Sequence, residues 1–396
     1  MSKLWSLLNL LVVWASAALA FDRVDTLQAV GVAFRHGDRI PQPYPIGFYP
    51  TDPHKNRTFA PIGSSGLTNR GKRREYRIGT TLRSRYNGFL DENYIGSDVA
   101  ALSTDNERTR MSLQLVLAGL YPPKDQQVWS DDVKWQPIPV DNLISDLASF
   151  TWAEKCPTRA KIYKELLESE DYKKDFGRFK EVMDKLSTLT GRNLQTAEEV
   201  YHLFHTLTAE TAMGLTLPEW TKEYYPHGPI INITLFQYLT DNYNTPLKRL
   251  NGGLFLRKML NDLGVNKDGK VEKKAKINLY SGHENNIGAL LYALKVWKNV
   301  IPAYSSAVIL ELHKKGSQYF IKVVYYKGIP EEFEDQTIPG CSEYCPLEDF
   351  LRIVKDVLPD DIMDACFGPP EDSQLIPKSL NPVVWIYEKI RSWFYL

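Results

Sequence analysis

Three apolar runs stand out along the chain, and each is followed by residues with helical spacing. Residues 27–34, 99–104 and 277–280 are almost continuously apolar, which indicates strands buried on both faces. Helical patterns follow at 69–86, from 107 until Pro122 and Pro123, and at 285–296, with Thr68 or Asn69 as the cap of the first. Strands that alternate with helices predict parallel pairing in an α/β sheet.

Two other stretches have a different pattern. Residues 305–313 and 319–327 flank a short polar turn and predict a hairpin, so antiparallel strands are expected at one end of the sheet. Residues 143–250 read as mostly helical, with charged amphipathic stretches. We therefore expect an α/β fold with three layers, a mixed and mainly parallel sheet with helices on both faces, and a helical cap. The body would comprise 21–142 and 251–396, and the cap 143–250.

Composition and charge exclude several classes of protein. Of 396 residues, 43% are hydrophobic and 12% aromatic, which is too many for a disordered chain. The 48 basic side chains balance the 48 acidic ones, so charge gives no reason to expect a nucleic-acid or anionic-membrane partner.

The first twenty residues have the pattern of a signal peptide. Lys3 precedes an apolar run at 4–14, and Ala18-Leu19-Ala20 provides small residues for cleavage. The run is too short to cross a bilayer core of roughly 30 Å. From residue 383 onward, Glu388, Lys389 and Arg391 interrupt a helical pattern, which predicts a packed helix rather than a membrane anchor. The mature chain is expected to be secreted, with a lysosomal address as the alternative.

Sequons and cysteines agree with an oxidising compartment. Asn56 and Asn232 each begin an N-x-T glycosylation sequon. The four cysteines, Cys156, Cys341, Cys345 and Cys366, are even in number and allow three pairings, among which the residues alone do not choose. Their spacing, without a neighbouring histidine, does not favour zinc.

Reactive side chains follow all three predicted parallel strands. These are residues 35–41 (RHGDRIP), 105–110 (DNERTR) and 281–285 (SGHEN). In open α/β sheets, ligands bind outside the carboxyl ends of the strands, where helix N-termini add N–H donors. Three arginines and two histidines at such a place predict a phosphate site, because guanidinium groups match phosphate oxygens bidentately. The basic run at Arg70, Lys72, Arg73, Arg74 and Arg77, by contrast, reads as a solvated helix face.

The motif RHGDRIP resembles the signature of the histidine acid phosphatases. LTNRGKRREYRIGTTLRSRY, STDNERTRMSLQLVLAGLYPP, WQPIPV, the hairpin and PGCSEYCPLEDF also resemble segments of the prostatic, lysosomal and insect venom members. The resemblance covers most of 25–366 and is weakest in the helical insertion.

The resemblance implies roles for individual residues. His36 would be the nucleophile that forms a phosphohistidine, Arg35, Arg39 and Arg108 would bind the phosphoryl oxygens, and His283 would be a second histidine on the phosphate. It also implies disulfides Cys156–Cys366 and Cys341–Cys345. Neither a metal nor another cofactor is implied.

The chain departs from the family's pattern at Glu284. Most relatives place an aspartic acid after the second histidine, as the acid that protonates the leaving alcohol, and Glu284 is one methylene longer. Asp38 is an alternative acid, although it reads mainly as a residue that orients its loop.

Simple electrostatics suit these roles. An arginine ~6 Å from His36, at an effective dielectric constant of ~20, disfavours the imidazolium by about 2.8 kcal/mol and so keeps the nucleophile neutral. A bound phosphate charge ~4 Å from Glu284 raises the pKa of its carboxyl group by roughly three units and offsets the arginines.

These observations predict a secreted acid phosphatase that hydrolyses small-molecule or peptide phosphate monoesters through a covalent phosphohistidine. The alternatives are a phytase-like inositol polyphosphate phosphatase and a catalytically impaired protein that binds a phosphate ligand. The sequence leaves open a homodimer and does not name the physiological substrate.

Overall fold

The computed structural model describes residues 23–142 and 156–368 of the 396. The predicted signal peptide at 1–20 and the predicted helix after residue 383 lie outside the described residues. Within the described ranges, no helix combines the length and the apolar character needed to span a membrane.

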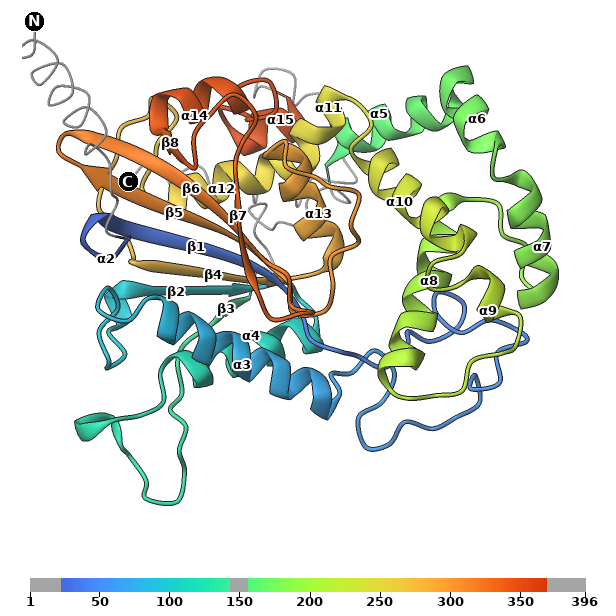
Figure 1. Ribbon diagram of the computed structural model, residues 1–396, viewed down its shortest axis with the longest axis horizontal. Helices are drawn as coiled ribbons and strands as arrows, with labels where there is room; N and C mark the ends of the chain where they lie inside the picture. The colour runs from blue at the N-terminus through green and yellow to red at the C-terminus, as the bar shows by residue number, and fades with distance from the viewer. Residues whose placement is uncertain (1–22, 143–155, 369–396) are drawn as a thin grey trace, which may run out of the picture.

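A mixed sheet forms the centre of the body (Figure 1). Its strand order is β3-β2-β4-β1-β5-β6-β7, with β8 also paired to β6. Strands β3, β2, β4 and β1 are parallel to one another, whereas β5 to β8 pair antiparallel. The strands span Leu27–Arg35 (β1), Val99–Ser103 (β2), Asp141–Asn142 (β3), Ile277–Gly282 (β4), Ala307–Lys315 (β5), Gln318–Tyr326 (β6), Phe333–Gln336 (β7) and Tyr344–Pro346 (β8). The predicted α/β class, with a mixed sheet and a mostly parallel core, is confirmed.

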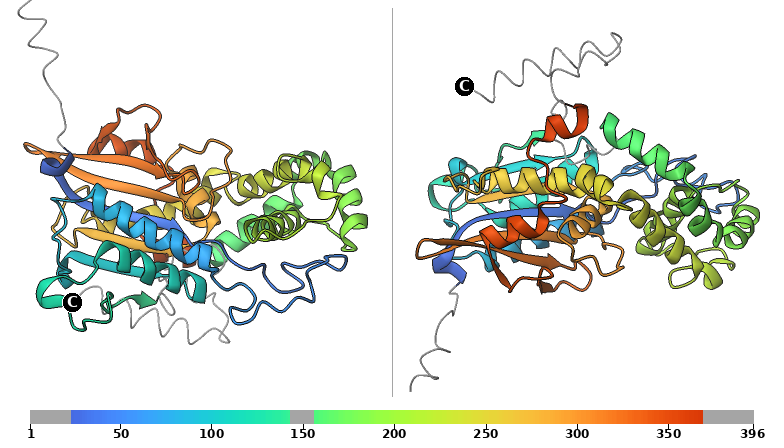
Figure 2. Two further views of the ribbon diagram at one scale, coloured as in Figure 1. Left: turned by 60° about the horizontal axis from the view of Figure 1, so that its bottom comes forward. Right: turned by 90° about the horizontal axis from the view of Figure 1, so that it is seen from above.

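Helices cover both faces of the sheet, as expected (Figures 1 and 2). On one face lie α3 (Asn69–Arg85) and α4 (Glu107–Leu120), and on the other α12 (Leu254–Asp262), α13 (Glu284–Ala293) and α14 (Leu347–Val354). Because side chains alternate along a strand, β1 contributes to two cores: Val30, Val32 and Phe34 pack with α3 and α4, and Ala29 and Ala33 with the opposite helices.

Local sequence explains where these helices begin and how closely they pack. The Thr68 hydroxyl accepts a hydrogen bond from the Gly71 N–H, which makes Thr68 the predicted cap of α3. Helices α3 and α4 approach at Gly79 and Gly119, where a Cβ on either would lie about 2 Å from a backbone oxygen of the other helix. Only glycine permits this approach.

The described part of the insertion is mostly helical and lies beside the body (Figures 1 and 2). The helices α5 to α10, which we call the cap, span Pro157–Glu168 (α5), Glu170–Gly177 (α6), Lys180–Thr190 (α7), Ala197–Ala212 (α8), Thr221–Tyr224 (α9) and Pro229–Asp241 (α10). The shorter helices are α2 (Arg23–Thr26), α11 (Thr245–Lys248), a π-helical turn (Arg249–Gly253), α15 (Ile362–Phe367) and two 3-10 helices (Gly96–Asp98 and Asp125–Gln127). The sequence division at 142/143 and 250/251 stays a prediction.

The segment 41–66 also packs on the cap, although the sequence pattern assigned it to the body. Tyr49 is buried among cap residues and its ring lies 6.1 Å from that of Trp220. The Thr51 hydroxyl donates to the Leu189 carbonyl of α7. This irregular segment therefore connects the end of β1 to the cap.

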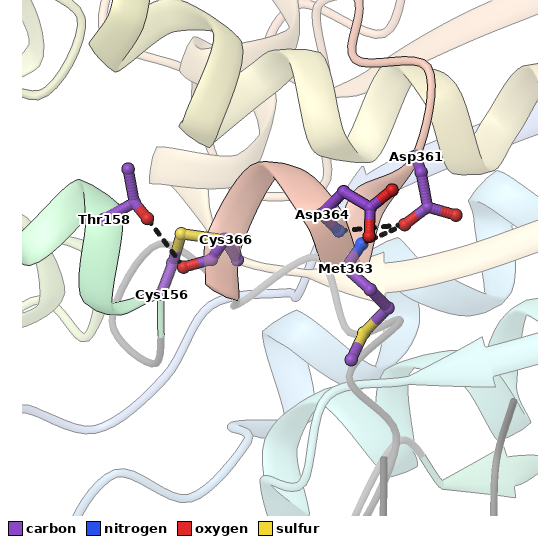
Figure 3. Close-up of a disulfide and its surroundings, with 6 residues drawn as sticks. All are labelled: Cys156, Thr158, Asp361, Met363, Asp364 and Cys366. Carbon is purple, nitrogen blue, oxygen red and sulfur yellow. Dashed lines mark hydrogen bonds between the residues drawn. A yellow bond between two sulfur atoms is a disulfide. The ribbon is translucent and has the colours of Figure 1, made fainter. Parts of the chain in front are cut away.

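All four cysteines form disulfides, in the two pairs that the family resemblance implies. Cys341–Cys345 closes a short loop near β8. Cys156 precedes α5, Cys366 lies in α15, and the Thr158 hydroxyl donates to the Cys366 carbonyl (Figure 3). This second disulfide joins the start of the cap to the last described helix of the body.

Candidate active site

The three predicted strand ends meet at one edge of the sheet. Arg35 at the end of β1 pairs with Gly282 of β4, and Ser103 of β2 pairs with Ser281 of β4. The residues that follow each strand, which include His36, Thr104 and His283, therefore lie beside one another. Strand β5 runs antiparallel to β1, so its first residue, Ala307, lies at the same edge opposite Phe34.

His36 is buried, with 1% of its surface exposed, and one of its two ring nitrogens makes a hydrogen bond. Its Nδ1 lies 2.8 Å from the Gly37 carbonyl oxygen. A carbonyl oxygen only accepts, so Nδ1 carries the proton and Nε2 carries the lone pair. Burial, followed by the charge of Arg108, by His283 and by Arg35, lowers the pKa of His36 well below its usual range. The arginines thus act in the expected direction, but burial is the larger cause.

The arginines of this edge are buried and keep unused N–H groups. Arg35 donates from Nη1 to the Pro302 carbonyl at 2.6 Å, and its guanidinium lies 4.1 Å from the ring centre of Tyr304. Its Nη2 and the Nε of Arg108 have no hydrogen-bond partner within residues 23–142 and 156–368. Arg39 is 5% exposed and donates to the Ile40 carbonyl. Burial, with the charge of Arg39, lowers the pKa of Arg108 to about 10. These orphan donors can bind an anion.

His283 is held between β2 and α4. Arg108 Nη2 lies 3.3 Å from His283 Nδ1, and because arginine only donates, Nδ1 is the acceptor. His283 Nε2 then carries the proton and lies 3.2 Å from the Thr104 hydroxyl. Burial and the charge of Arg108 lower the pKa of His283 to about 3. Its ring is edge-on to that of His36, with centroids 5.4 Å apart, so the two predicted histidines are brought together.

Glu284, the first residue of α13, reaches the same site despite the longer side chain. Its Oε2 lies 3.1 Å from Arg35 Nε. Burial opposes its ionisation, but the charge of Arg35, followed by His205, His36 and His283, keeps the pKa of the Glu284 carboxyl well below its usual range. Without a ligand, Glu284 is therefore an ion-paired carboxylate.

Asp38 is directed away from this group of side chains. Its buried carboxylate lies 2.9 Å from Arg74 Nε and 3.4 Å from Arg70 Nε, both on α3. Thr68 donates from its backbone N–H and its hydroxyl to the Asp38 carbonyl. Asp38 thus fixes the loop after β1 against α3. The prediction of a solvated face is wrong at Arg74, whose side chain is only 16% exposed, because the spacing on the helix did not reveal the carboxylate that it contacts. Arg70 also contacts this carboxylate but stays exposed, as predicted.

Three aromatic groups of the site were missed from the sequence. Tyr201 and His205 of α8 reach Glu284 from the cap: the Tyr201 hydroxyl donates to Oε1 at 2.6 Å, and His205 Nε2 lies 3.7 Å from the same oxygen. Tyr304 underlies Arg35 and comes just before β5. The expected antiparallel hairpin was the available signal for Tyr304, because it places the start of β5 at the ligand edge.

The two sequons have exposed asparagines. Asn56 lies in a turn of the 41–66 segment, and Asn232 lies on α10. Thr234, the third residue of the second sequon, is fully buried and donates to the Ile230 carbonyl. Glycosylation at both stays a prediction.

Comparison with known proteins shows the family to which the sequence is related. Residues 26–326 match the histidine phosphatase superfamily (branch 2). The chain is 40% identical over 355 residues to the venom acid phosphatase of Apis mellifera, and the alignment covers 90% of each chain. It is 32% identical over 362 residues to the lysosomal acid phosphatase of Homo sapiens (89% of this chain and 84% of the relative) and 31% identical over 345 residues to the human prostatic acid phosphatase (86% and 88%).

Solved structures support the fold. The apo form of Hafnia alvei phytase aligns with a TM-score of 0.64 at 17% identity, over 88% of this chain and 99% of the phytase. Citrobacter braakii phytase aligns with a TM-score of 0.63 at 16% identity, over 85% and 99%. At such identities the likeness shows the fold alone.

Proposed function

Because this chain belongs to branch 2 of the histidine phosphatase superfamily and is an acid phosphatase, we propose that it hydrolyses phosphate monoesters through a phosphohistidine on His36. The observation that carries the proposal is the convergence of a neutral His36, with its Nε2 lone pair unprotonated, on buried arginine N–H groups that lack protein acceptors. This arrangement pairs a nucleophile with an anion site.

In the first step, His36 Nε2 attacks phosphorus and the bond from phosphorus to the ester oxygen breaks. Arg35, Arg39 and Arg108 bind the phosphoryl oxygens, and His283 is the second histidine beside the phosphate. Glu284, in its protonated form, gives its proton to the leaving alcohol. In the second step, water attacks phosphorus, the Glu284 carboxylate takes the proton of that water, and the bond to Nε2 breaks. Glu284 is then protonated again, and it gives this proton up when inorganic phosphate leaves and Arg35 pairs with its carboxylate once more.

Substrate binding supplies the condition for the first proton transfer. In the free enzyme Arg35 holds Glu284 ionised. A bound phosphate shares the Arg35 guanidinium and adds negative charge beside the carboxyl group, and both effects raise the pKa of Glu284. Proton donation is thereby coupled to occupancy of the site.

Acid quenching during turnover of a ³²P-labelled aryl phosphate tests the mechanism. Labelled peptide containing His36 is expected, and His36→Ala should lose turnover and labelling while its circular dichroism spectrum stays unchanged. His227→Ala, at an exposed cap histidine, is the matched control and should retain both. Full activity in His36→Ala would exclude the mechanism.

We further propose that the protein is secreted after cleavage behind Ala20 and carries glycans at Asn56 and Asn232. N-terminal sequencing of the secreted protein should begin at Phe21, and glycosidase treatment should reduce its mass. Light scattering of the same material distinguishes a monomer from the homodimer that the sequence leaves open. A panel of aryl phosphate, lysophosphatidate, phosphotyrosine peptide and phytate at several pH values tests the substrate class, and preference for phytate would favour the phytase-like alternative.

A further inference from the structure

The cap contributes side chains directly to the proton donor. Tyr201 and His205 are four residues apart on α8, so they project from the same face of that helix. The Tyr201 hydroxyl lies 2.6 Å from Glu284 Oε1, and the rings of Tyr201 and His205 meet edge-on with centroids 4.4 Å apart. Glu284 is therefore held from two sides, at Oε2 by Arg35 of the body and at Oε1 by the cap.

The chemistry of the groups fixes the direction of this hydrogen bond. A carboxylate can only accept, so Tyr201 donates to Oε1. When the carboxyl group takes up a proton, Oε1 still accepts from Tyr201, and the proton belongs on Oε2. Oε2 is the oxygen beside Arg35, whose Nη2 is free for the phosphate. Tyr201 thus directs the transferable proton to the oxygen on the side of the arginine N–H groups that can bind the phosphate.

The contact also restrains the extra methylene of Glu284. A glutamate has one more rotatable bond than an aspartate, and an unrestrained carboxyl group would occupy several orientations. The Tyr201 ring is fixed by His205 and by Tyr238 of α10, whose ring centroid is 5.6 Å away. The body alone does not supply this restraint on Oε1 among the residues that the structure describes.

His205 supports this arrangement from inside the protein. It is 1% exposed and its ring packs between Tyr201 and Phe204. Neither ring nitrogen has a hydrogen-bond partner in the described ranges, and Nε2 faces Oε1 at 3.7 Å. The titratable and charged groups around it are Glu284 of α13, Arg35 at the end of β1, Arg39 of the loop after β1, and His202 of its own helix.

We propose that Tyr201 is a positioning residue for the proton donor Glu284, supplied by the cap, and that it sets the oxygen from which the proton leaves. This inference rests on the proposed function of Glu284. Through it, the cap has a part in the chemistry as well as in covering the site.

Tyr201→Phe removes only the hydroxyl and tests the proposal. A hydrogen bond to a charged group contributes roughly 1.5–3 kcal/mol, so kcat for an alkyl phosphate such as glycerol phosphate should fall about 10- to 100-fold, with KM nearly unchanged. Nitrophenyl phosphate, whose leaving group needs little protonation, should lose less than about 3-fold. Retained aryl activity also shows that the variant is folded.

Two further variants separate positioning from a structural effect. Adding Tyr201→Phe to Glu284→Gln should cause no additional loss, since no acid is left to position. Tyr225→Phe, at a cap tyrosine that bonds Thr208 of α8 and not Glu284, should leave both substrates within about 2-fold of the wild type.

Equal losses for alkyl and aryl substrates in Tyr201→Phe, an unchanged alkyl rate, or a further loss in the Glu284→Gln background would overturn the positioning role. These outcomes differ from failure of the proposed function. If Glu284→Gln itself slows both substrates equally, then Glu284 is not the proton donor, and the positioning proposal is rejected with it.

Discussion

The surroundings of Glu284 accommodate a side chain one methylene longer than the aspartate that is usual in the family. The carboxyl group stays between Arg35 and Tyr201, with Oε2 directed to the body and Oε1 to the cap. Asp38, the alternative acid in the segment RHGDRIP, contacts Arg70 and Arg74 and so holds its loop against α3. At the scale of single residues, Glu284 is therefore the carboxylic acid that stays available for the proposed proton transfer.

Glu284→Gln should separate substrates by the quality of their leaving group. Glutamine keeps the shape and an acceptor for Tyr201, but it has no proton to release at a useful pKa. General acid catalysis is typically worth ~10²–10⁴-fold, so kcat for glycerol phosphate should fall by that order while nitrophenyl phosphate loses much less. The variant should still accumulate phosphohistidine from the aryl substrate. Steady-state kinetics with both esters and acid-quench labelling measure these effects.

Glu284→Asp is the matched variant. Removing one methylene draws the carboxyl group back by ~1.5 Å, beyond hydrogen-bond reach of Tyr201 unless the backbone moves. Alkyl phosphate turnover should be lower than in the wild type and measurably higher than in Glu284→Gln. An aspartate variant no better than the glutamine variant would contradict proton donation from this position.

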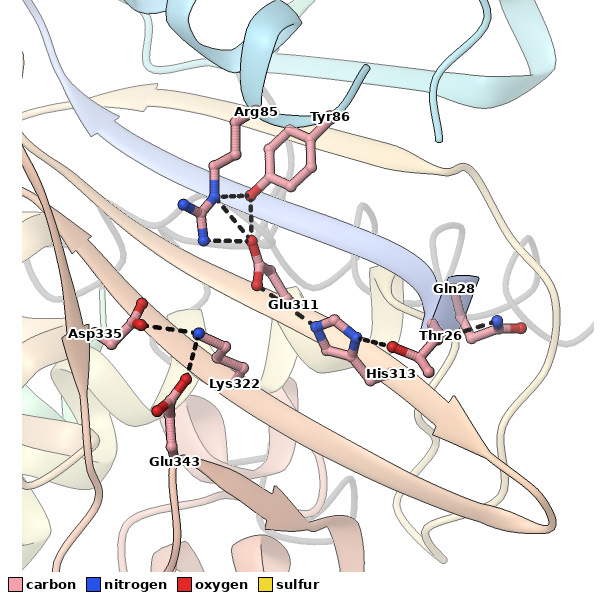
Figure 4. A network of polar contacts seen from close by, with 9 residues as sticks. All are labelled: Thr26, Gln28, Arg85, Tyr86, Glu311, His313, Lys322, Asp335 and Glu343. Carbon is pink, nitrogen blue, oxygen red and sulfur yellow. Dashed lines mark hydrogen bonds and ion pairs between the residues drawn. The ribbon is translucent and has the colours of Figure 1, made fainter. Parts of the chain in front are cut away.

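At the scale of elements, a buried ionic network ties the end of α3 to β5 (Figure 4). Glu311 Oε1 accepts from Arg85 Nη2 at 2.9 Å and from the Tyr86 hydroxyl at 2.8 Å, and its Oε2 lies 3.5 Å from His313 Nε2. Burial opposes ionisation of Glu311, but His313, Arg85 and Tyr86 lower the pKa of its carboxyl group to about 2. A depressed carboxyl pKa stabilises the fold above the unfolded value, and this stabilisation is lost as the pH falls toward the folded value.

Glu311→Gln should therefore destabilise the protein strongly at neutral pH. Removing one member of a buried pair leaves the Arg85 charge poorly compensated, which costs roughly 3–5 kcal/mol. The difference between variant and wild type should shrink between pH ~4.5 and ~2, where Glu311 takes up its proton. Urea unfolding at several pH values measures it. Glu331→Gln, which breaks the exposed pair with Arg77, is the control and should cost at most about 1 kcal/mol. Equal effects of the two substitutions would contradict the assigned role of the network.

The sequence predicts elements best where burial leaves a periodic pattern. The pattern predicted the strands β1, β2 and β4, the N-cap residue Thr68 of α3, and the hairpin of β5 and β6. The ends of the predicted strands also located His36, Arg108 and His283. The contribution of the cap helices α5 to α10 to the site could not be predicted from the sequence. The amphipathic pattern of α8 shows that one face is buried, but it does not show that Tyr201 and His205 on that face meet Glu284. The segment 41–66 has no regular period, so its packing on α7 and α9 had no local signal.

At the scale of the whole molecule, the disulfide Cys156–Cys366 joins cap and body across a sequence separation of 210 residues. Both cysteines are fully buried and pack with Leu250 and Leu254. In the loop-entropy model, closing so long a loop stabilises the folded state by up to about 5 kcal/mol, whereas closing a loop as short as that of Cys341–Cys345 contributes about 2 kcal/mol.

Replacing each pair by alanine should therefore have unequal effects. The Cys156→Ala, Cys366→Ala variant should unfold at a clearly lower urea concentration than the Cys341→Ala, Cys345→Ala variant, and peptide mapping of the wild type should return the same two pairs. Because the long disulfide anchors the start of the cap, its loss should also lower activity toward alkyl phosphates. A larger destabilisation from the short loop would contradict the model.

Another contact links the cap to the irregular segment, and it depends on a proton. Asp52 of the 41–66 segment and Glu210 of α8 are buried neighbours, and both carboxyl oxygens of Glu210 lack another hydrogen-bond partner within the described residues, so the two carboxyl groups can share a hydrogen bond. Two carboxyl groups can do so only while one keeps its proton. Burial, with the charge of Asp52, raises the pKa of Glu210 to about 9, and burial raises that of Asp52. Tyr49 and His54 are the neighbouring titratable groups.

This pair predicts a protein that is more stable in acid than at neutral pH. A carboxyl pKa raised by folding gives stability that is complete below the unfolded value of 4.5 and is lost progressively as the pH rises toward about 9. Between pH about 5 and 8, Glu210 is protonated in the folded state and ionised in the unfolded state. The free energy of unfolding should therefore fall by up to ~1.4 kcal/mol for each pH unit in this range. Urea unfolding of the wild type across this range should show the decline.

Glu210→Gln retains a hydrogen-bond donor for Asp52 and does not titrate, so its stability should fall much less and should exceed that of the wild type at pH ~8. Glu219→Gln, at an exposed cap residue paired with Lys222, should keep the wild-type slope. A wild-type stability that is flat or rises from pH ~5 to ~8 would refute the shared proton. Because Glu210 and Tyr201 lie on the same helix, loss of the proton should also loosen Tyr201 from Glu284, so alkyl phosphate turnover should be less steeply pH-dependent in Glu210→Gln than in the wild type.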